Sequence, residues 1–202
     1  MPIFTFRPVF GPVLAGVVAV LCVAACVGLV LADDIENLVR TVPLLLFFSA
    51  AAGALFWQPH IVIEEAGITV VNVFRTYFVP WPHVERIDTR YTLTLFTAKR
   101  RIPVWAAPSP GIRGAIAIER SDVRNLGDSA YGAGQSVRPG DSVGTASGQV
   151  AFVLRQRWEA LRDAGALDSA VVDPDALRVS THRVTIAVLA GLLAAAMLGL
   201  VL

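Results

Sequence analysis

The sequence is poor in charged residues and in cysteine. Only 16% of its 202 residues are charged, whereas an average soluble protein has about 25%. The formal net charge is +1, which excludes a nucleic-acid-binding protein that relies on excess basic charge. The two cysteines are too few for a disulfide-stabilised scaffold. Apolar residues make up 55% of the chain, which excludes a wholly disordered protein.

Ionisable residues are missing from three long apolar runs, at residues 8–32, 41–59 and 184–202. A helix needs about 20 apolar residues to cross the hydrocarbon core of a bilayer. Lipid offers the backbone no hydrogen-bond partner, so such runs must be helical. The sequence therefore predicts membrane-spanning helices at about residues 9–32, 41–58 and 183–202. Because ionisable residues usually mark transport pathways, their absence argues against a membrane enzyme or a transporter subunit.

The charges that flank the apolar runs predict how the chain crosses the membrane. Between the first two runs, residues 33–40 carry Asp33, Asp34 and Glu36 against a single Arg40. The long polar segment after the second run is rich in arginine. Positively charged flanks stay in the cytoplasm, so we expect residues 1–60 to form a helical hairpin with its acidic loop outside. The protein is then a multi-pass protein of the cell membrane with a cytoplasmic domain.

A competing interpretation concerns Cys26. Residues 23–26, Val-Ala-Ala-Cys, fit the loose pattern of a bacterial lipoprotein cleavage site, which would leave Cys26 as a lipidated N-terminus. Against this, the apolar run continues through Leu31, whereas a mature lipoprotein becomes polar soon after its cysteine. The sequence leaves both interpretations open.

The polar segment begins with short stretches typical of β-strands, at residues 61–64, 68–74, 77–79, 92–95 and 101–105. Turns are predicted between them at Gly67, at Arg75–Thr76 and at Lys99–Arg100. Short strands with frequent turns favour an antiparallel sandwich or an open barrel.

The rest of the polar segment divides into an insertion, a helix and a linker. Gly, Ser and Pro supply about two-fifths of residues 107–148, so we expect a flexible insertion with one weak strand at 115–118. Residues 149–164 carry an apolar stripe at helical spacing, formed by Val150, Val153, Leu154, Trp158 and Leu161. The domain is expected to span residues 61–165, followed by a linker at 166–182.

Several short motifs in this segment resemble a known family. They are Gly67-Ile68-Thr69-Val70, Asn72-Val73-Phe74-Arg75-Thr76, Val79-Pro80-Trp81 with Val84, and Ile102-Pro103-Val104-Trp105-Ala106. Together they resemble the bacterial PH domain of actinobacterial membrane proteins, the family named for a low-molecular-weight protein antigen. The resemblance covers about residues 61–106 and implies a PH-like fold. The expected fold class is thus membrane α plus β: a transmembrane hairpin, a PH-like sandwich with one amphipathic helix, and a C-terminal transmembrane helix.

No arrangement typical of an active site stands out. Residues 140–144, Gly-Asp-Ser-Val-Gly, match the nucleophile-elbow pattern, but that motif requires a strand before the serine and a helix after it. His60, His83 and His182 are isolated rather than spaced as metal ligands. We therefore expect no catalysis, no metal and no cofactor.

Basic residues at two predicted turns are the candidates for contact with lipid or with a partner, namely Arg75, Lys99, Arg100 and Arg101. Near an anionic bilayer each such charge contributes about 1 kcal/mol; the alternative is a solvated turn. Trp81 and Trp105 are expected in the core or at the membrane interface rather than in a ligand groove.

Small residues recur every fourth position in the last apolar run, at Ala187, Gly191, Ala195 and Gly199. Such a stripe is typical of a helix-packing seam, because helices in lipid associate through close backbone approach. The expected partner is the first membrane helix or another protein chain.

The sequence thus favours a non-enzymatic integral membrane protein that displays a cytoplasmic PH-like binding module. Its predicted role is that of a scaffold or an accessory subunit, with membrane lipids and another membrane protein or complex as partners, and no nucleic acid. The alternative is a module that binds anionic lipid, and a membrane enzyme or transporter subunit comes third.

Overall fold

The computed structural model describes residues 3–109, 141–142, 144–167 and 176–201. The chain divides into two compact units, one built of helices and one mainly of strands. The helical unit comprises Pro8–Pro59, Val73–Arg75 and Thr181–Leu202. The strand unit comprises Met1–Arg7, His60–Asn72 and Thr76–Ser180.

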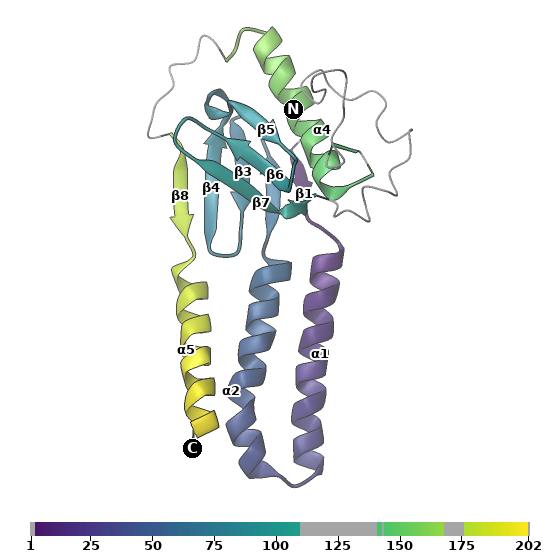
Figure 1. The fold of residues 1–202 in the computed structure, drawn as a ribbon, viewed down its shortest axis with the longest axis vertical. Helices are drawn as coiled ribbons and strands as arrows, with labels where there is room; N and C mark the ends of the chain where they lie inside the picture. The colour runs from purple at the N-terminus through teal and green to yellow at the C-terminus, as the bar shows by residue number, and fades with distance from the viewer. Residues whose placement is uncertain (1–2, 110–140, 143, 168–175, 202) are drawn as a thin grey trace. The chain divides into compact units, whose positions relative to one another are not determined.

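Three long helices make up the helical unit: α1 (Phe10–Leu31), α2 (Ile35–Ala52), which continues as a π-helical turn η1 (Gly53–Trp57), and α5 (Arg183–Val201). Each is long and apolar enough to cross a membrane. Helix α2 lies between α1 and α5 and contacts both (Figure 1). The outward-facing side chains are largely apolar, as expected of helices that meet lipid.

The connection between α1 and α2 is shorter than the sequence predicts. Helix α1 ends at Leu31, and Asp33 adopts a left-handed conformation with φ of 56°. The Asp34 side chain then accepts the backbone N–H of Asn37 at 3.2 Å and caps α2. Helix α2 therefore begins at Ile35 rather than at residue 41. Glu36 and Arg40 lie on its first turns, where they form an ion pair at 2.7 Å.

The strand unit contains two sheets. The first has the order β1 (Phe4–Phe6), β2 (His60–Ile63), β3 (Gly67–Val71), β4 (Arg75–Pro80) and β8 (Arg178–Thr181). The second has the order β5 (Arg86–Asp88), β6 (Thr92–Phe96) and β7 (Arg101–Pro108), and a short 3-10 turn η2 (Trp81–His83) precedes it. The pairs β1–β2, β2–β3, β3–β4, β5–β6 and β6–β7 are antiparallel. The predicted antiparallel, PH-like architecture is confirmed.

Several strand boundaries differ from the sequence-based prediction. Strands β1 and β8 lie in segments that we assigned to the hairpin and to the linker. The strand expected at 68–74 ends at Val71, because the chain turns through Asn72–Phe74 before β4. At Gly67 an added Cβ would lie 2.5 Å from the Val79 carbonyl oxygen, so only glycine fits this close approach of β3 to β4.

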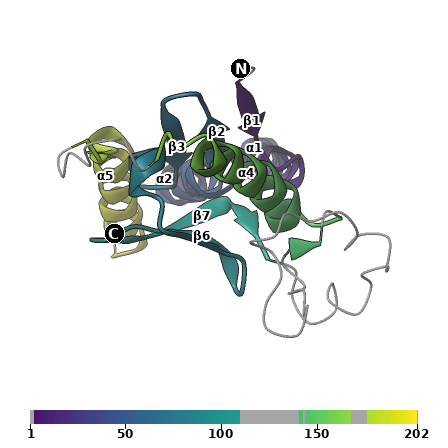
Figure 2. The ribbon, with the colours of Figure 1, turned by 90° about the horizontal axis from the view of Figure 1, so that it is seen from above.

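The core lies between the sheets and is closed by helix α4 (Ala146–Asp163). Alternate residues of the strands point inward and are fully buried, among them Ile61, Ile63, Ile68, Val70, Leu93, Leu95, Ile102 and Val104. Helix α4 lies across the space between the sheets, beside β7 (Figure 2), and buries Val150, Ala151 and Leu154. The helix begins three residues before the predicted start because Thr145 accepts the Gly148 N–H at 3.0 Å.

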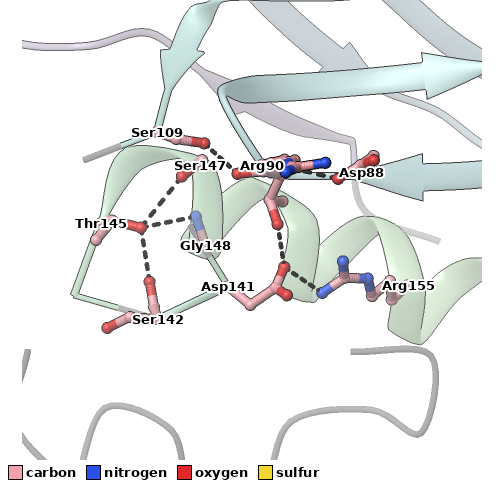
Figure 3. A network of polar contacts seen from close by, with 10 residues as sticks. Asp88, Arg90, Ser109, Asp141, Ser142, Thr145, Ser147, Gly148 and Arg155 are labelled. Carbon is pink, nitrogen blue, oxygen red and sulfur yellow. Dashed lines mark hydrogen bonds and ion pairs between the residues drawn. The ribbon is translucent and has the colours of Figure 1, made fainter. Parts of the chain in front are cut away.

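The insertion predicted at residues 107–148 has folded ends. Ala107 is buried in β7, and Asp141 and Ser142 are buried ahead of α4. Thr89 holds both ends: its carbonyl accepts the Ser109 hydroxyl, and its own hydroxyl donates to Asp141 at 2.6 Å. Figure 3 shows Ser109 and Asp141 in this network of polar contacts. Both ends of the predicted insertion therefore pack into the domain. The weak strand expected at 115–118 lies outside the described residues.

Candidate binding surface

An open groove runs over the outer face of the three-stranded sheet. Because inward-pointing residues of β6 and β7 fill the core, their neighbours in sequence point outward. The groove has a volume of about 430 Å³ and is lined by Arg86, Asp88, Arg90, Tyr91, Thr92, Thr94, Phe96 and Arg101. Its lining is therefore basic and aromatic.

A ladder of two arginines and one phenylalanine crosses this groove. Arg86 of β5 is the register partner of Phe96 of β6, which in turn is the partner of Arg101 of β7. The guanidinium carbon of Arg86 lies 4.0 Å from the centroid of the Phe96 ring, and that of Arg101 lies 5.4 Å from it. Both distances are within cation–π range, so the Phe96 ring holds two arginines side by side. We call these three residues the Arg–Phe–Arg ladder.

The positive charge of the groove is only partly offset. Arg90 adds a third guanidinium, 5.3 Å from the Tyr91 ring centroid. The acidic residue of the lining is Asp88, and its carboxylate accepts the Arg90 backbone N–H at 3.0 Å. Within the described part of the chain, no ion pair involves Arg86, Arg90 or Arg101. The groove therefore suits a ligand that carries negative charge and an apolar group.

The predicted basic residues lie in different places. Lys99 and Arg100 are exposed in the β6–β7 turn, which is closed by a bond from the Thr97 N–H to the Arg100 carbonyl at 2.9 Å. Arg101 opens β7 and belongs to the Arg–Phe–Arg ladder. Arg75 opens β4 in the other sheet, and its loop groups with the helical unit. Of the four predicted contact residues, only Arg101 therefore lines the groove.

Sequence reasoning missed Arg86, Arg90 and Phe96 as parts of this surface. Strand β5 has only three residues and carries no alternation long enough to be recognised. Phe96 follows directly on the predicted strand 92–95, and its period-two spacing from Thr92 and Thr94 was the available signal.

The two candidate tryptophans have opposite environments. Trp81 is buried, and its indole N–H donates to the Glu64 carbonyl at 3.0 Å. Trp105 is 54% exposed, on the same outward face of β7 as Arg101 and Pro103. Trp105 therefore offers an apolar surface on the sheet face that carries the groove.

The described part of the nucleophile-elbow pattern lies just before helix α4. The Ser142 side chain is fully buried, and its carbonyl accepts the Thr145 hydroxyl at 2.8 Å. Gly140 and Val143 lie outside the described residues. An added Cβ at Gly148 would lie 1.8 Å from the Ser142 carbonyl oxygen, so the first turn of α4 packs closely on this segment. Among the described residues, no group of three or more His, Cys, Asp or Glu side chains could hold a metal ion.

The small-residue stripe of α5 lies mostly away from its neighbour α2. Ala187, Gly191 and Ala195 are exposed in the helical unit. Of the four predicted seam residues, Gly199 lies against α2, where an added Cβ would be 2.8 Å from the Arg40 carbonyl oxygen. The less exposed residues of α5 fall on a different stripe, formed by Thr185, Leu189, Leu192, Ala196 and Gly199.

Comparison with known proteins bears on the strand unit. Residues 58–126 match the family model described as Bacterial PH domain. No curated protein and no solved structure matches the chain. The match includes the motifs at 67–84 and 102–106, and two antiparallel sheets closed by a helix agree with it. The chain therefore carries a PH-like domain that is similar to the Bacterial PH domain family over residues 58–126, together with three helices long and apolar enough to span a membrane.

Proposed function

We propose that the protein is a non-enzymatic scaffold or accessory subunit, whose PH domain binds another membrane protein through the groove. The Arg–Phe–Arg ladder carries this proposal. Arginine and aromatic residues dominate the binding energy of protein interfaces. Here an aromatic ring fixes two guanidinium groups on an accessible sheet face, with no carboxylate paired to them among the described residues. Such pre-ordered donors lose little entropy on binding a carboxylate of a partner.

The proposal places the PH domain in the cytoplasm. Asp33, Asp34 and Glu36 lie at the α1–α2 connection, whereas Arg7 and Arg183 flank the opposite ends of α1 and α5. The positive-inside rule assigns the basic ends to the cytoplasm. A cytoplasm-dependent reporter fused after Gln58 is expected to be active. Activity of a periplasm-dependent reporter at this point would contradict the topology and favour the lipoprotein interpretation of Cys26.

Photo-crosslinking in cells tests the groove. Tyr91 lines it and is 80% exposed, so we would replace it with the crosslinking amino acid p-benzoylphenylalanine. The same amino acid at Gln156, an exposed position on α4, is the positional control. A membrane-protein adduct is expected at position 91 and not at 156.

Charge variants complete this experiment. Arg86→Ala combined with Arg101→Ala should abolish the adduct at position 91. Arg162→Ala is the matched control, because Arg162 also lies 5.4 Å from an aromatic centroid, that of Trp158, but outside the groove. An adduct that survives the double substitution would contradict the proposal. A lipid adduct in place of a protein adduct would favour the anionic-lipid alternative.

A further inference from the structure

The loop between β3 and β4 is hydrogen-bonded to the residue that precedes α5. The backbone N–H of His182 donates to the Phe74 carbonyl at 2.9 Å. The Nδ1 atom of the same histidine lies 3.2 Å from the Val73 carbonyl oxygen. Helix α5 begins at the next residue, Arg183. The loop Val73–Arg75 is therefore held at the start of a candidate membrane span.

The end of a second candidate span meets the same histidine. Gln58 directly follows η1, and its side-chain nitrogen lies 2.6 Å from His182 Nδ1. The end of the α2 span, the start of α5 and the loop Val73–Arg75 thus converge on His182 within one unit. Because the ends of spans lie at the boundary between hydrocarbon and headgroups, the loop lies at that depth too.

The side chains of this loop suit that boundary. Phe74 is 47% exposed although it is a large apolar side chain, and Trp57 at the end of η1 is 54% exposed. Tryptophan is enriched in the belts that anchor membrane proteins at the interface, and an exposed phenylalanine buries its ring in the same layer. Arg75 is exposed, and in the described ranges no ion pair involves it. Its guanidinium is suited to a lipid phosphate, which it can bind through two parallel hydrogen bonds.

We propose that Val73–Arg75 is a membrane-contact loop, in which Phe74 enters the lipid interface and Arg75 binds a phospholipid phosphate. The occupant is the headgroup layer of the bilayer that holds α2 and α5. This inference is independent of the protein partner proposed for the groove.

Spin labelling of the full chain tests the depth of the loop. In a protein whose Cys22 and Cys26 are replaced by Ala, a nitroxide would be attached at Phe74→Cys, Trp57→Cys or Tyr91→Cys. The labelled proteins are reconstituted in vesicles of phosphatidylcholine and phosphatidylglycerol. Oxygen concentrates in lipid and a nickel chelate stays in water, so their collision rates with the label report its depth. We expect a several-fold higher oxygen-to-nickel ratio at positions 74 and 57 than at 91.

A second set of variants tests Arg75. With the label at position 74, Arg75→Gln should increase access to the nickel chelate, Arg75→Lys should restore part of the protection, and Arg90→Gln should have no effect. A label at 74 that is as accessible to nickel as the label at 91 would overturn the proposal. A label shielded from both reagents would also overturn it, because protein rather than lipid would then cover the loop.

Discussion

The side-chain oxygen Oδ1 of Asn72 accepts the backbone N–H of Trp105 at 3.0 Å. The Nδ2 group of the same residue donates to the Pro103 carbonyl at 2.8 Å. Strand β7 is an edge of the three-stranded sheet, whereas Asn72 follows β3 of the other sheet. One buried amide thus supplies the hydrogen bonds that a neighbouring strand would make, and it joins the two sheets.

Replacing Asn72 is therefore expected to loosen this edge of β7. Asn72→Leu leaves the Trp105 N–H and the Pro103 carbonyl without their partner, and a buried polar group left unpaired costs about 1–3 kcal/mol. Hydrogen exchange at the Trp105 amide should accelerate accordingly. Asn72→Asp keeps the acceptor for the Trp105 N–H but sets a carboxylate oxygen against the Pro103 carbonyl, so it should retain only part of the protection at Trp105. Equal exchange in Asn72→Leu and the unsubstituted protein would show that the contact contributes nothing.

The Asn72 contact illustrates what the sequence can and cannot predict. Asn72 and Trp105 both lie in motifs that resemble the PH family, so the sequence indicated the fold and the approximate strands. Their contact joins residues 33 positions apart, and no local periodicity reports such a pairing. The same limitation hid the Arg–Phe–Arg ladder, since it depends on the register of three strands. Apolar length, in contrast, is a local property, and it located the three helices that are long and apolar enough to span a membrane.

A buried ion pair holds the segment before α4. Arg155 of α4 and Asp141 lie 2.6 Å apart, with side chains 5% and 2% exposed. The Gly, Ser and Pro content around Asp141 predicted flexibility. That prediction missed the ion pair, because composition does not reveal that one carboxylate meets an arginine 14 residues later.

Breaking this pair on one side should destabilise the domain strongly. Arg155→Met leaves the Asp141 charge buried and unpaired, and such losses typically cost about 3–5 kcal/mol. Adding Asp141→Asn removes the charge and keeps an acceptor for the Thr89 hydroxyl, so the double variant should recover part of the stability. Thermal unfolding in mild detergent is the measurement. A double variant less stable than Arg155→Met would contradict this interpretation.

Arg162→Met provides the control for that series. Arg162 and Asp163 pair at 3.2 Å with side chains 49% and 70% exposed, and such surface pairs contribute little. Its unfolding temperature should match that of the unsubstituted protein.

The start of α2 should depend on pH. The Asn37 side chain, and then its backbone N–H, donate to the Asp34 carboxylate and lower the pKa of that group below the usual value of 3.8. A lowered pKa in the folded state means that the carboxylate stabilises the helix start above the unfolded pKa. This stabilisation is lost as the pH falls through the folded pKa.

Amide exchange at Asn37 and Leu38 reports this cap. After correction for the intrinsic pH dependence, protection should decrease in acid for the unsubstituted protein. Asp34→Ala should lack the protection at every pH, whereas Asp34→Ser keeps an N-cap oxygen that does not titrate in this range. Protection in Asp34→Ser that follows the same acid transition would refute the role of the Asp34 carboxylate.

Two neighbouring alanines distinguish the packed and the open face of α5. Ala196 is 1% exposed and lies one turn before Gly199, which meets the Arg40 carbonyl of α2, whereas Ala195 is exposed. Ala196→Leu should therefore overpack the α2–α5 contact and cost about 1–3 kcal/mol. Ala195→Leu adds the same volume on the open face and should leave the unfolding temperature in detergent unchanged. A larger fall in the unfolding temperature for Ala195→Leu than for Ala196→Leu would contradict this interpretation. It would mean that α5 is stabilised through the predicted stripe of Ala187, Gly191 and Ala195 rather than through the face that contacts α2.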